Sequence, residues 1–301
     1  MIIFDHNTYY HRRERAAKSF AEFLHSEMVE TIMERLTELP NINADNIFIM
    51  GSYNGMLGKK LYDTFDNSAI CQCDLSPSFV NQARDVCPNI YTFCHSINAL
   101  ENPYMILDMH NKDIIIINTL LHIINDALGF LIQIHRMLNK NGMFLATLFG
   151  GETLRELRDV IFQHGNSIYN PPATQKNPSQ FTPMGSVQDW GNLLKKANFF
   201  TPLADTIRIT VWYEEIQSLI RDLRNMGETS INSDIPQSFS KSSLDEINTL
   251  YKKRWGRQDN KIPATFDIIV LTGWKYLDGN NLQPPISKID VIKMLKNTNE
   301  E

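Results

Sequence analysis

Short apolar runs that alternate with helical segments constrain this chain more than any other feature of its sequence. The run Ile114–Ile117 is the most apolar, and a strand with no polar face must be covered on both sides. Strands that alternate with helices form right-handed βαβ units around a parallel sheet. We therefore predict a buried parallel sheet with Ile114–Ile117 near its centre. Four further predicted strands lie at 47–50, 69–73, 90–94 and 143–149.

The last third of the chain follows a different pattern. Thr206–Trp212 alternates apolar and polar residues, as a half-exposed strand does, and Thr265–Gly273 reads as another strand. Two helical segments, 213–226 and 243–255, separate them. We expect an antiparallel hairpin at one edge of the sheet, with a helical cap inserted over 213–262. The predicted fold is α/β and Rossmann-like, with a seven-stranded, mostly parallel sheet and one antiparallel edge strand.

Length and periodicity favour a single domain over 1–278. The chain has 301 residues, which is long for one compact domain and short for two. Its expected parts are an N-terminal helix at 15–39, a cofactor-binding half at 45–150 and a C-terminal tail at 279–301. Residues 166–183 are rich in Asn, Pro, Gln and Ser, which predicts a loop longer than ordinary connections.

Charge and hydropathy exclude several classes of protein. The net charge is −5 and no basic stripe stands out, so we expect no nucleic-acid partner. The locally basic segment Arg12–Arg15 is interpreted as the solvated start of a helix. No apolar run approaches the roughly 20 residues of a membrane-spanning helix. Met1–Asp5 has the character of neither a signal nor a transit peptide, so a cytoplasmic location is expected.

Cysteine and acidic residues show no metal-binding pattern. The cysteines at 71, 73, 87 and 94 contain no C-x-x-C pair. Cys71 and Cys73 are spaced more closely than zinc ligands usually are. Buried free thiols in a reducing compartment explain them better. No facial triad of His, Asp and Glu can be identified either, so we predict no metal site.

The turn after the first strand is where a doubly wound fold binds a nucleotide. Its glycines, Gly51, Gly55 and Gly58, have the spacing G-x-x-x-G-x-x-G, which does not fit the dinucleotide pattern G-x-G-x-x-G. Class I methyltransferases have an acidic residue followed by G-x-G-x-G. Gly51 and Gly55 match the outer glycines, whereas Tyr53 stands at the middle one and Ile49 at the acid. An equally good explanation is that the two glycines only form a turn.

These departures weaken the predicted cofactor site. A middle glycine lets the backbone approach a ligand closely, and Tyr53 adds a large side chain there. A missing charge-assisted hydrogen bond costs roughly 1.5–3 kcal/mol, or about ten- to a hundredfold in affinity. The acid expected after the third strand is also absent, because Ser96 and Ile97 stand there. We predict that S-adenosylmethionine binds weakly or not at all.

Asp74 is the best-placed candidate for binding a ribose. It ends the second strand, and Ser76-Pro77 follows as an N-cap and a first-turn proline. A carboxylate at this position can accept both ribose hydroxyls, although it can also simply cap a turn. On the ribose interpretation, Asp74→Ala removes any nucleoside binding and leaves the melting temperature nearly unchanged.

Several longer stretches resemble the methyltransferase-like assembly factors of respiratory complex I and their alphaproteobacterial relatives, within the class I S-adenosylmethionine-dependent superfamily. The resemblance covers nearly the whole chain. It implies a class I methyltransferase fold, S-adenosylmethionine as cofactor and a protein partner, possibly a complex I subunit. In the mitochondrial members the activity is arginine hydroxylation. The stretches are Leu121–Asp126, Leu148–Arg158, Leu223–Thr229, Ile262–Phe266 and Leu271–Trp274.

Two other functions remain open. One is a non-catalytic assembly chaperone of complex I, which keeps the fold and docks its partner. The other is the malonyl carrier protein O-methyltransferase of biotin synthesis, a more distant relative that lacks the stretches around Gly151 and Gly227. Cofactor affinity and activity on a malonyl carrier protein distinguish these alternatives.

Two residues are candidates for catalysis. His122 follows the fourth strand, at the sheet edge where ligands bind, and would act as a general base; a core histidine is an equally good interpretation. Glu152 follows Gly150-Gly151 at a helix start, where it either faces a substrate or complements the helix dipole. We expect the working surface at this edge, with Glu152 or Glu228 pairing with an arginine of the partner.

Overall fold

The computed structural model describes residues 3–39, 44–103, 111–168, 184–231 and 239–276. They form one seven-stranded sheet in the order β3-β2-β1-β4-β5-β7-β6. The first five strands are parallel, and β7 is antiparallel to both of its neighbours. The strands are β1 (Asn46–Met50), β2 (Ala69–Asp74), β3 (Tyr91–Cys94), β4 (Lys112–Asn118), β5 (Leu138–Phe149), β6 (Phe200–Tyr213) and β7 (Ile262–Trp274).

The predicted sheet is confirmed, including the antiparallel hairpin at its edge. The antiparallel strand β7 lies one place inside that edge, because β6 pairs along its outer side. β4 is central, as its apolar sequence indicates. Ile115 and Ile117 pack into the core on one face and Ile114 and Ile116 into the core on the other, all fully buried.

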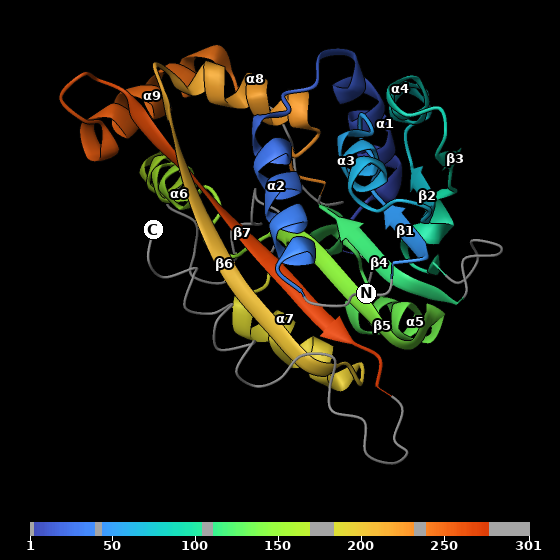
Figure 1. Ribbon diagram of the computed structural model, residues 1–301. Helices are drawn as coiled ribbons and strands as arrows, with labels where there is room; N and C mark the ends of the chain where they lie inside the picture. Colours follow the sequence, from blue (N-terminus) through green and yellow to red (C-terminus); the bar gives the residue numbers. More distant parts are fainter. Residues whose placement is uncertain (1–2, 40–43, 104–110, 169–183, 232–238, 277–301) are drawn as a thin grey trace.

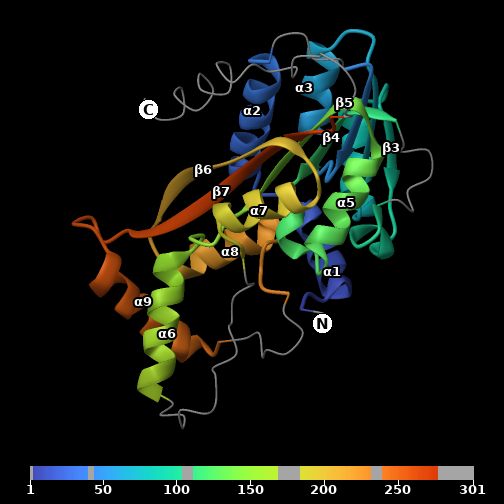
Figure 2. The ribbon, with the colours of Figure 1, turned by 90° about the horizontal axis from the view of Figure 1, so that it is seen from below.

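Helices cover both faces of the sheet (Figure 2). On one face lie α2 (Phe23–Thr37) and α3 (Met56–Thr64), which build one core with β1 and β4. On the other lie α5 (Ala127–Met137) and α7 (Val187–Lys196). A capping box formed by Ser186 and Asp189 starts α7. The helix α4 (Pro77–Val86) starts at the expected N-cap, Ser76.

The cap lies beyond the end of β5, where β6 and β7 continue (Figure 1). It consists of α6 (Arg155–Ile168), α8 (Ile216–Met226) and α9 (Lys241–Trp255). Buried residues of these helices share a core with α2 and the start of β7. The predicted loop at 166–183 begins inside α6, and its residues 169–183 lie outside the described part, as does the predicted tail.

The single N-terminal helix predicted over 15–39 is wrong. The chain forms α1 (His6–Ala16), a 3-10 turn at Ala17–Ser19 and then α2. Phe20 adopts extended backbone with ψ of 123°, and its ring packs edge-on against Phe79 at 5.1 Å between centroids. A tertiary contact therefore breaks the helix at a position where local periodicity continues.

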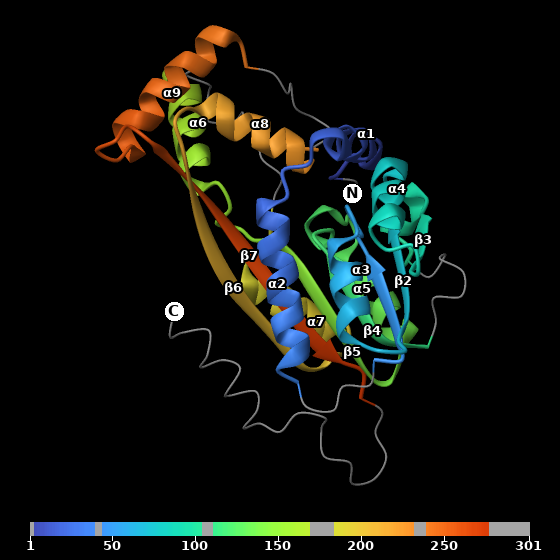
Figure 3. The same cartoon turned by 45° about the horizontal axis from the view of Figure 1, so that its top comes forward.

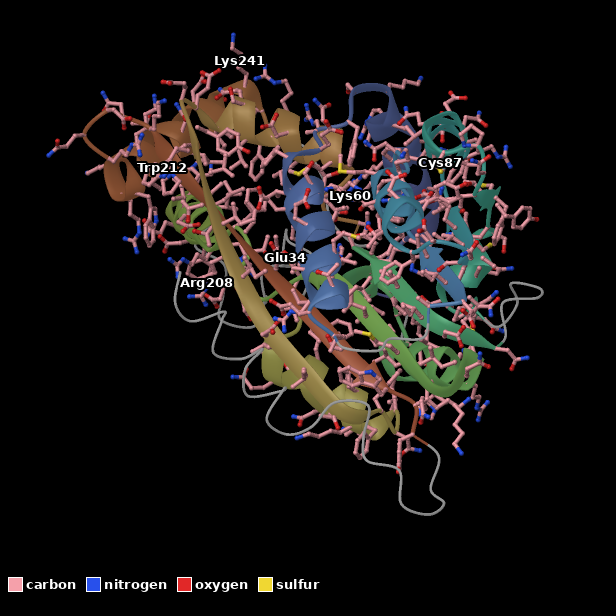
Figure 4. All side chains as sticks on the ribbon, in the orientation of Figure 1. Glu34, Lys60, Cys87, Arg208, Trp212 and Lys241 are labelled. Atoms are coloured by element: carbon pink, nitrogen blue, oxygen red, sulfur yellow. The ribbon has the colours of Figure 1, made fainter. Side chains whose placement is uncertain are left out.

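Trp212 does not belong to the core between the cap and the sheet, although it is a large aromatic residue of a predicted strand. Trp212 is 39% exposed on the edge strand β6, where it lies along the same strand as Arg208 (Figure 4). The guanidinium of Arg257 covers its ring at 4.3 Å from the centroid. Its sequence neighbour Tyr213 is buried, as expected.

Three of the four cysteines are buried free thiols, as the sequence predicts, and Cys94 is the exception. Cys71, Cys73 and Cys87 are buried free thiols, whereas Cys94 is a free thiol at the surface. Within the described ranges, no three His, Cys, Asp or Glu side chains are arranged to hold a metal ion. Nor does the described part of the chain contain a helix with the length and hydropathy needed to span a bilayer.

Candidate functional site

The carboxyl ends of the parallel strands meet at one edge of the sheet, beside α1 and the end of α8 (Figure 3). The side chain of Asn118, at the end of β4, donates to the Gly51 carbonyl at 3.2 Å. It also accepts from the Thr147 hydroxyl of β5 at 3.0 Å. This buried network fixes the spacing between three strand ends, so the loops that follow them start from a rigid base.

Both glycines of the predicted loop are required by the packing of the chain against itself. Gly51 and Gly55 have φ of +92° and +86°, a region that favours glycine. A Cβ on Gly51 would lie 2.3 Å from the Asn118 carbonyl oxygen, and one on Gly55 would lie 2.7 Å from the Ala83 Cα. Both positions therefore need glycine without any ligand. Tyr53, between them, also adopts positive φ, at 48°.

Asp74 lies at the end of β2, as predicted, and is fully buried. Its Oδ1 accepts from Arg13 Nε at 2.7 Å and from the Ser76 amide at 3.0 Å. Its Oδ2 accepts from Arg13 Nη2 at 2.5 Å and from the Tyr53 amide at 2.9 Å. A carboxylate offers about four lone-pair positions, so donors of this chain occupy all of them.

Arg13 is the residue that sequence reasoning missed. It is 1% exposed, whereas its basic neighbourhood predicts a solvated helix start. Its guanidinium carbon lies 3.7 Å from the centre of the Tyr53 ring and 5.2 Å from that of Phe79. Tyr9, one helical turn earlier, accepts from Nη1 at 3.2 Å. The one available signal was the spacing of Tyr9, Arg13 and Ala16, which places them on one face of a helix.

Charge and burial explain how this pair titrates. Burial by itself lowers the pKa of Arg13 and raises the pKa of Asp74, because it disfavours the charged forms. For Arg13, burial is outweighed by Asp74 together with Tyr53 and Tyr9; for Asp74, it is outweighed by Arg13 together with the backbone amides of Ser76 and Tyr53. The pKa of Arg13 is therefore raised and the pKa of Asp74 lowered, so both groups are charged at neutral pH.

His25, on α2, closes the site from another side. Its ring is tilted against the Tyr53 ring, with the centroids 4.4 Å apart. Neither ring nitrogen has a hydrogen-bond partner among the described residues, and the Ser52 hydroxyl is also without one. Burial lowers the pKa of His25 to about 3, so it is neutral at physiological pH. No pattern in the sequence predicted that His25 would be buried in this site.

His122 and Glu228 form a second buried group at the same edge. His122 Nε2 lies 3.0 Å from Glu228 Oε2, and the side chains are 1% and 9% exposed. Among the described residues, His122 Nδ1 and Glu228 Oε1 have no partner. The structure pairs His122 with Glu228 rather than with Glu152. A histidine beside a carboxylate is a common arrangement for proton transfer.

Glu152 lies between β5 and α6 and is exposed. Its backbone amide is 3.3 Å from Asp267 Oδ2. The preceding Gly150 leaves room for that carboxylate, because a Cβ there would lie 2.4 Å from the same oxygen. The carboxylate of Glu152 therefore remains close to solvent, in contrast to that of Glu228.

Sequence comparison identifies a methyltransferase domain over residues 49–146. A mitochondrial arginine-hydroxylase NDUFAF5 of Dictyostelium discoideum is 31% identical over 265 residues, which are 84% of this chain and 60% of the relative. The mouse counterpart is 32% identical over 61% of this chain and 52% of its own length. The chain thus spans between half and three fifths of the length of these two relatives.

A second group of relatives matches at greater length and lower identity. The malonyl-[acyl-carrier protein] O-methyltransferase of Laribacter hongkongensis is 24% identical over 87% of this chain and 86% of the relative. Among solved structures, the YcgJ protein of Bacillus subtilis superposes with a TM-score of 0.55 at 13% identity, over 84% of this chain and 100% of that one. The chain therefore has the class I methyltransferase fold, and its residues 49–146 match the methyltransferase domain family.

Proposed function

We propose that this protein uses a methyltransferase fold to act on or dock a protein partner, and that it binds S-adenosylmethionine weakly or not at all. One observation carries the proposal: all four acceptor positions of Asp74 are filled by donors of the chain itself. A ribose would have to displace Arg13 to use them.

Two further features support weak binding. Tyr53 is 2% exposed at the position where the methyltransferase loop has its middle glycine, so its ring fills space next to Asp74. Ile49, at the position of the loop's acid, is fully buried in the core beneath the sheet. It offers no acceptor for the cationic amino-acid end of the cofactor.

The proposed partner follows from the similarity to the arginine-hydroxylases of Dictyostelium discoideum and mouse. They suggest a protein that presents an arginine, which a carboxylate recognises through paired hydrogen bonds. Of the two carboxylates considered from sequence, that of Glu152 belongs to an exposed residue and that of Glu228 is held by His122. We therefore assign Glu152 to partner contact and the pair of His122 and Glu228 to the interior of the same site, where His122 would act as a base.

Calorimetry tests the cofactor part of the proposal directly. S-adenosylmethionine and S-adenosylhomocysteine are titrated into the full chain at neutral pH. We expect no saturation in the low micromolar range. A dissociation constant of a few micromolar, roughly −7 to −8 kcal/mol, contradicts the proposal and identifies a working cofactor site.

A carrier-protein methyltransferase is the second candidate, because the match to that enzyme extends over most of both chains. Its test is transfer of a labelled methyl group from S-adenosylmethionine to a malonyl carrier protein. Transfer would replace the proposal above. A chain without transfer and without cofactor binding that still captures its partner would be a docking protein without chemistry of its own.

A further inference from the structure

We propose that Arg13 is an internal occupant of the nucleoside site and competes with a ribose-bearing ligand for Asp74. The inference deepens the proposed function, since it explains weak cofactor binding by a competitor within the chain. We call α1 (His6–Ala16), which carries Arg13, the plug of this site. The other residues that line the site still suit a nucleoside.

The contacts of Arg13 imitate those of a bound nucleoside. Its Nε and Nη2 donate to the two different oxygens of Asp74, as the two hydroxyls of a ribose would. Its flat guanidinium lies over the Tyr53 ring, and Arg stacks on aromatic faces in the way a planar ligand does. One side chain thus supplies both the paired donors and the flat surface that the ligand would bring.

Several polar atoms around the plug remain unsatisfied. The described residues provide no partner for either ring nitrogen of His25, for the Ser52 hydroxyl or for His95 Nε2. Ser52 and Tyr53 are neighbours in the loop, and the His95 amide donates to the Asp74 carbonyl at 3.0 Å. Buried polar atoms without partners are costly and rare. A ligand with donors and acceptors would satisfy atoms that Arg13 leaves unpaired.

The segment 225–231 holds the plug in place. A Cβ on Gly227 would lie 3.6 Å from the Arg13 Cα, so this turn packs directly on α1. Arg12 donates to the carbonyls of Thr229 and Ser230, and the Asp5 amide donates to that of Ile231. Gly227 and Thr229 belong to the stretch Leu223–Thr229 that the sequence singled out, and with Ser230 and Ile231 they form a clasp that holds α1.

The same clasp links the plug to the second buried group. Gly227 contacts α1, and the next residue, Glu228, pairs with His122. On its other side α1 is fixed to the start of α4, where Glu14 accepts from the Ser76 hydroxyl at 2.5 Å. The broken helix at Ala17–Ser19 separates α1 from α2. The plug is therefore a separate helix, and its displacement does not require α2 to unfold.

The decisive experiment replaces Arg13 with methionine, which keeps much of its volume and removes its donors. Adenosine and 2′,3′-dideoxyadenosine are titrated into parent, Arg13→Met and the control Arg15→Met, whose arginine is exposed on the same helix. We expect adenosine to bind Arg13→Met at least about tenfold more tightly than parent, because the competing state is removed. The gain should vanish with the dideoxy compound, and Arg15→Met should match the parent.

The outcomes separate this inference from the proposed function. Micromolar cofactor binding by the parent would reject the proposed function. Weak binding by both parent and Arg13→Met would leave the proposed function standing and reject the plug. Weaker binding by Arg13→Met than by the parent would also reject it, since Arg13 would then hold the ligand.

A measurement on the parent covers the case in which Arg13→Met does not fold. Amide hydrogen exchange over His6–Ala16 is followed with and without millimolar adenosine. Displacement of the plug predicts faster exchange in α1 when adenosine is bound, while α2 stays unchanged. Binding with unaltered exchange in α1, or no binding even at this concentration, would overturn the inference.

Discussion

Two buried charged groups at the same sheet edge differ in how completely their polar atoms are satisfied. Asp74 has a donor at every acceptor position. The pair of His122 and Glu228 keeps one nitrogen and one oxygen without partners among the described residues. A saturated group fixes structure, whereas an unsatisfied one is available to a ligand. The Asp74 carboxylate is therefore closed to a ligand while Arg13 is bound to it, whereas the pair of His122 and Glu228 has atoms available for chemistry or recognition.

The largest predicted effect is a loss of stability when the buried pair of Arg13 and Asp74 is broken. Asp74→Asn should lower the free energy of unfolding by about 3–5 kcal/mol, because it leaves the Arg13 charge buried without its partner. This revises the expectation from sequence that a substitution at Asp74 leaves the melting temperature nearly unchanged. Urea unfolding at pH 7 measures it.

A matched control uses an exposed ion pair. Glu30→Gln removes a carboxylate that pairs with Lys60 while both side chains remain well exposed, and surface pairs contribute little. Similar stability losses in Asp74→Asn and Glu30→Gln would show that the loss in Asp74→Asn is not caused by the burial of Arg13 and Asp74.

The next effect is a pH dependence caused by His25. Its pKa is lowered to about 3 by burial, so the unfolded chain binds a proton below about pH 6.5 that the folded chain does not. Stability then falls as pH drops, by up to about 1.4 kcal/mol per pH unit between about pH 6.5 and pH 3. Between pH 7 and pH 5, His25→Phe should lose about 2 kcal/mol less than the parent. Equal losses would place His25 in contact with water.

The Asp74 carboxylate titrates in a different window. The pKa of Asp74 in the folded chain lies below the ordinary value of 3.8. Its contribution to the free energy of unfolding is therefore complete above that value and is lost as pH falls through the folded pKa. Comparing His25→Phe with the parent above pH 4 therefore isolates the histidine, and the two groups can be distinguished in one acid titration.

A smaller effect is expected at the unsatisfied group. Glu228→Gln keeps the shape of the side chain and one acceptor for His122, so stability should change by only about 1 kcal/mol. The comparison with Asp74→Asn uses the same chemical change at two buried acids. If Glu228→Gln lowered the stability as much as Asp74→Asn, Glu228 would also be needed for the fold, and the two buried acids would not differ in the way proposed here.

Sequence patterns predicted what depends on neighbours along the chain. The strand ends, the N-cap at Ser76 and the placement of Asp74 all follow from local periodicity and turn chemistry. The pairing of Arg13 with Asp74 spans 61 positions, and nothing local marks one arginine of a basic segment as buried. The break at Phe20 has the same cause, since it depends on a ring contact with Phe79.

The smallest effect on stability is predicted for Glu152, and with it the clearest effect on recognition. Glu152 is exposed, so Glu152→Ala should change the free energy of unfolding by no more than about 0.5 kcal/mol. If it binds an arginine of the partner through paired hydrogen bonds, recovery of a complex I subunit in a pull-down should drop severalfold. The control is Glu30→Ala, on the exposed face of α2, which should recover as much as the parent. Equal recovery by Glu152→Ala would remove this carboxylate from the contact and leave the unsatisfied pair of His122 and Glu228 as the remaining feature of the edge. Absence of recovery from the parent itself would reject a complex I subunit as the partner.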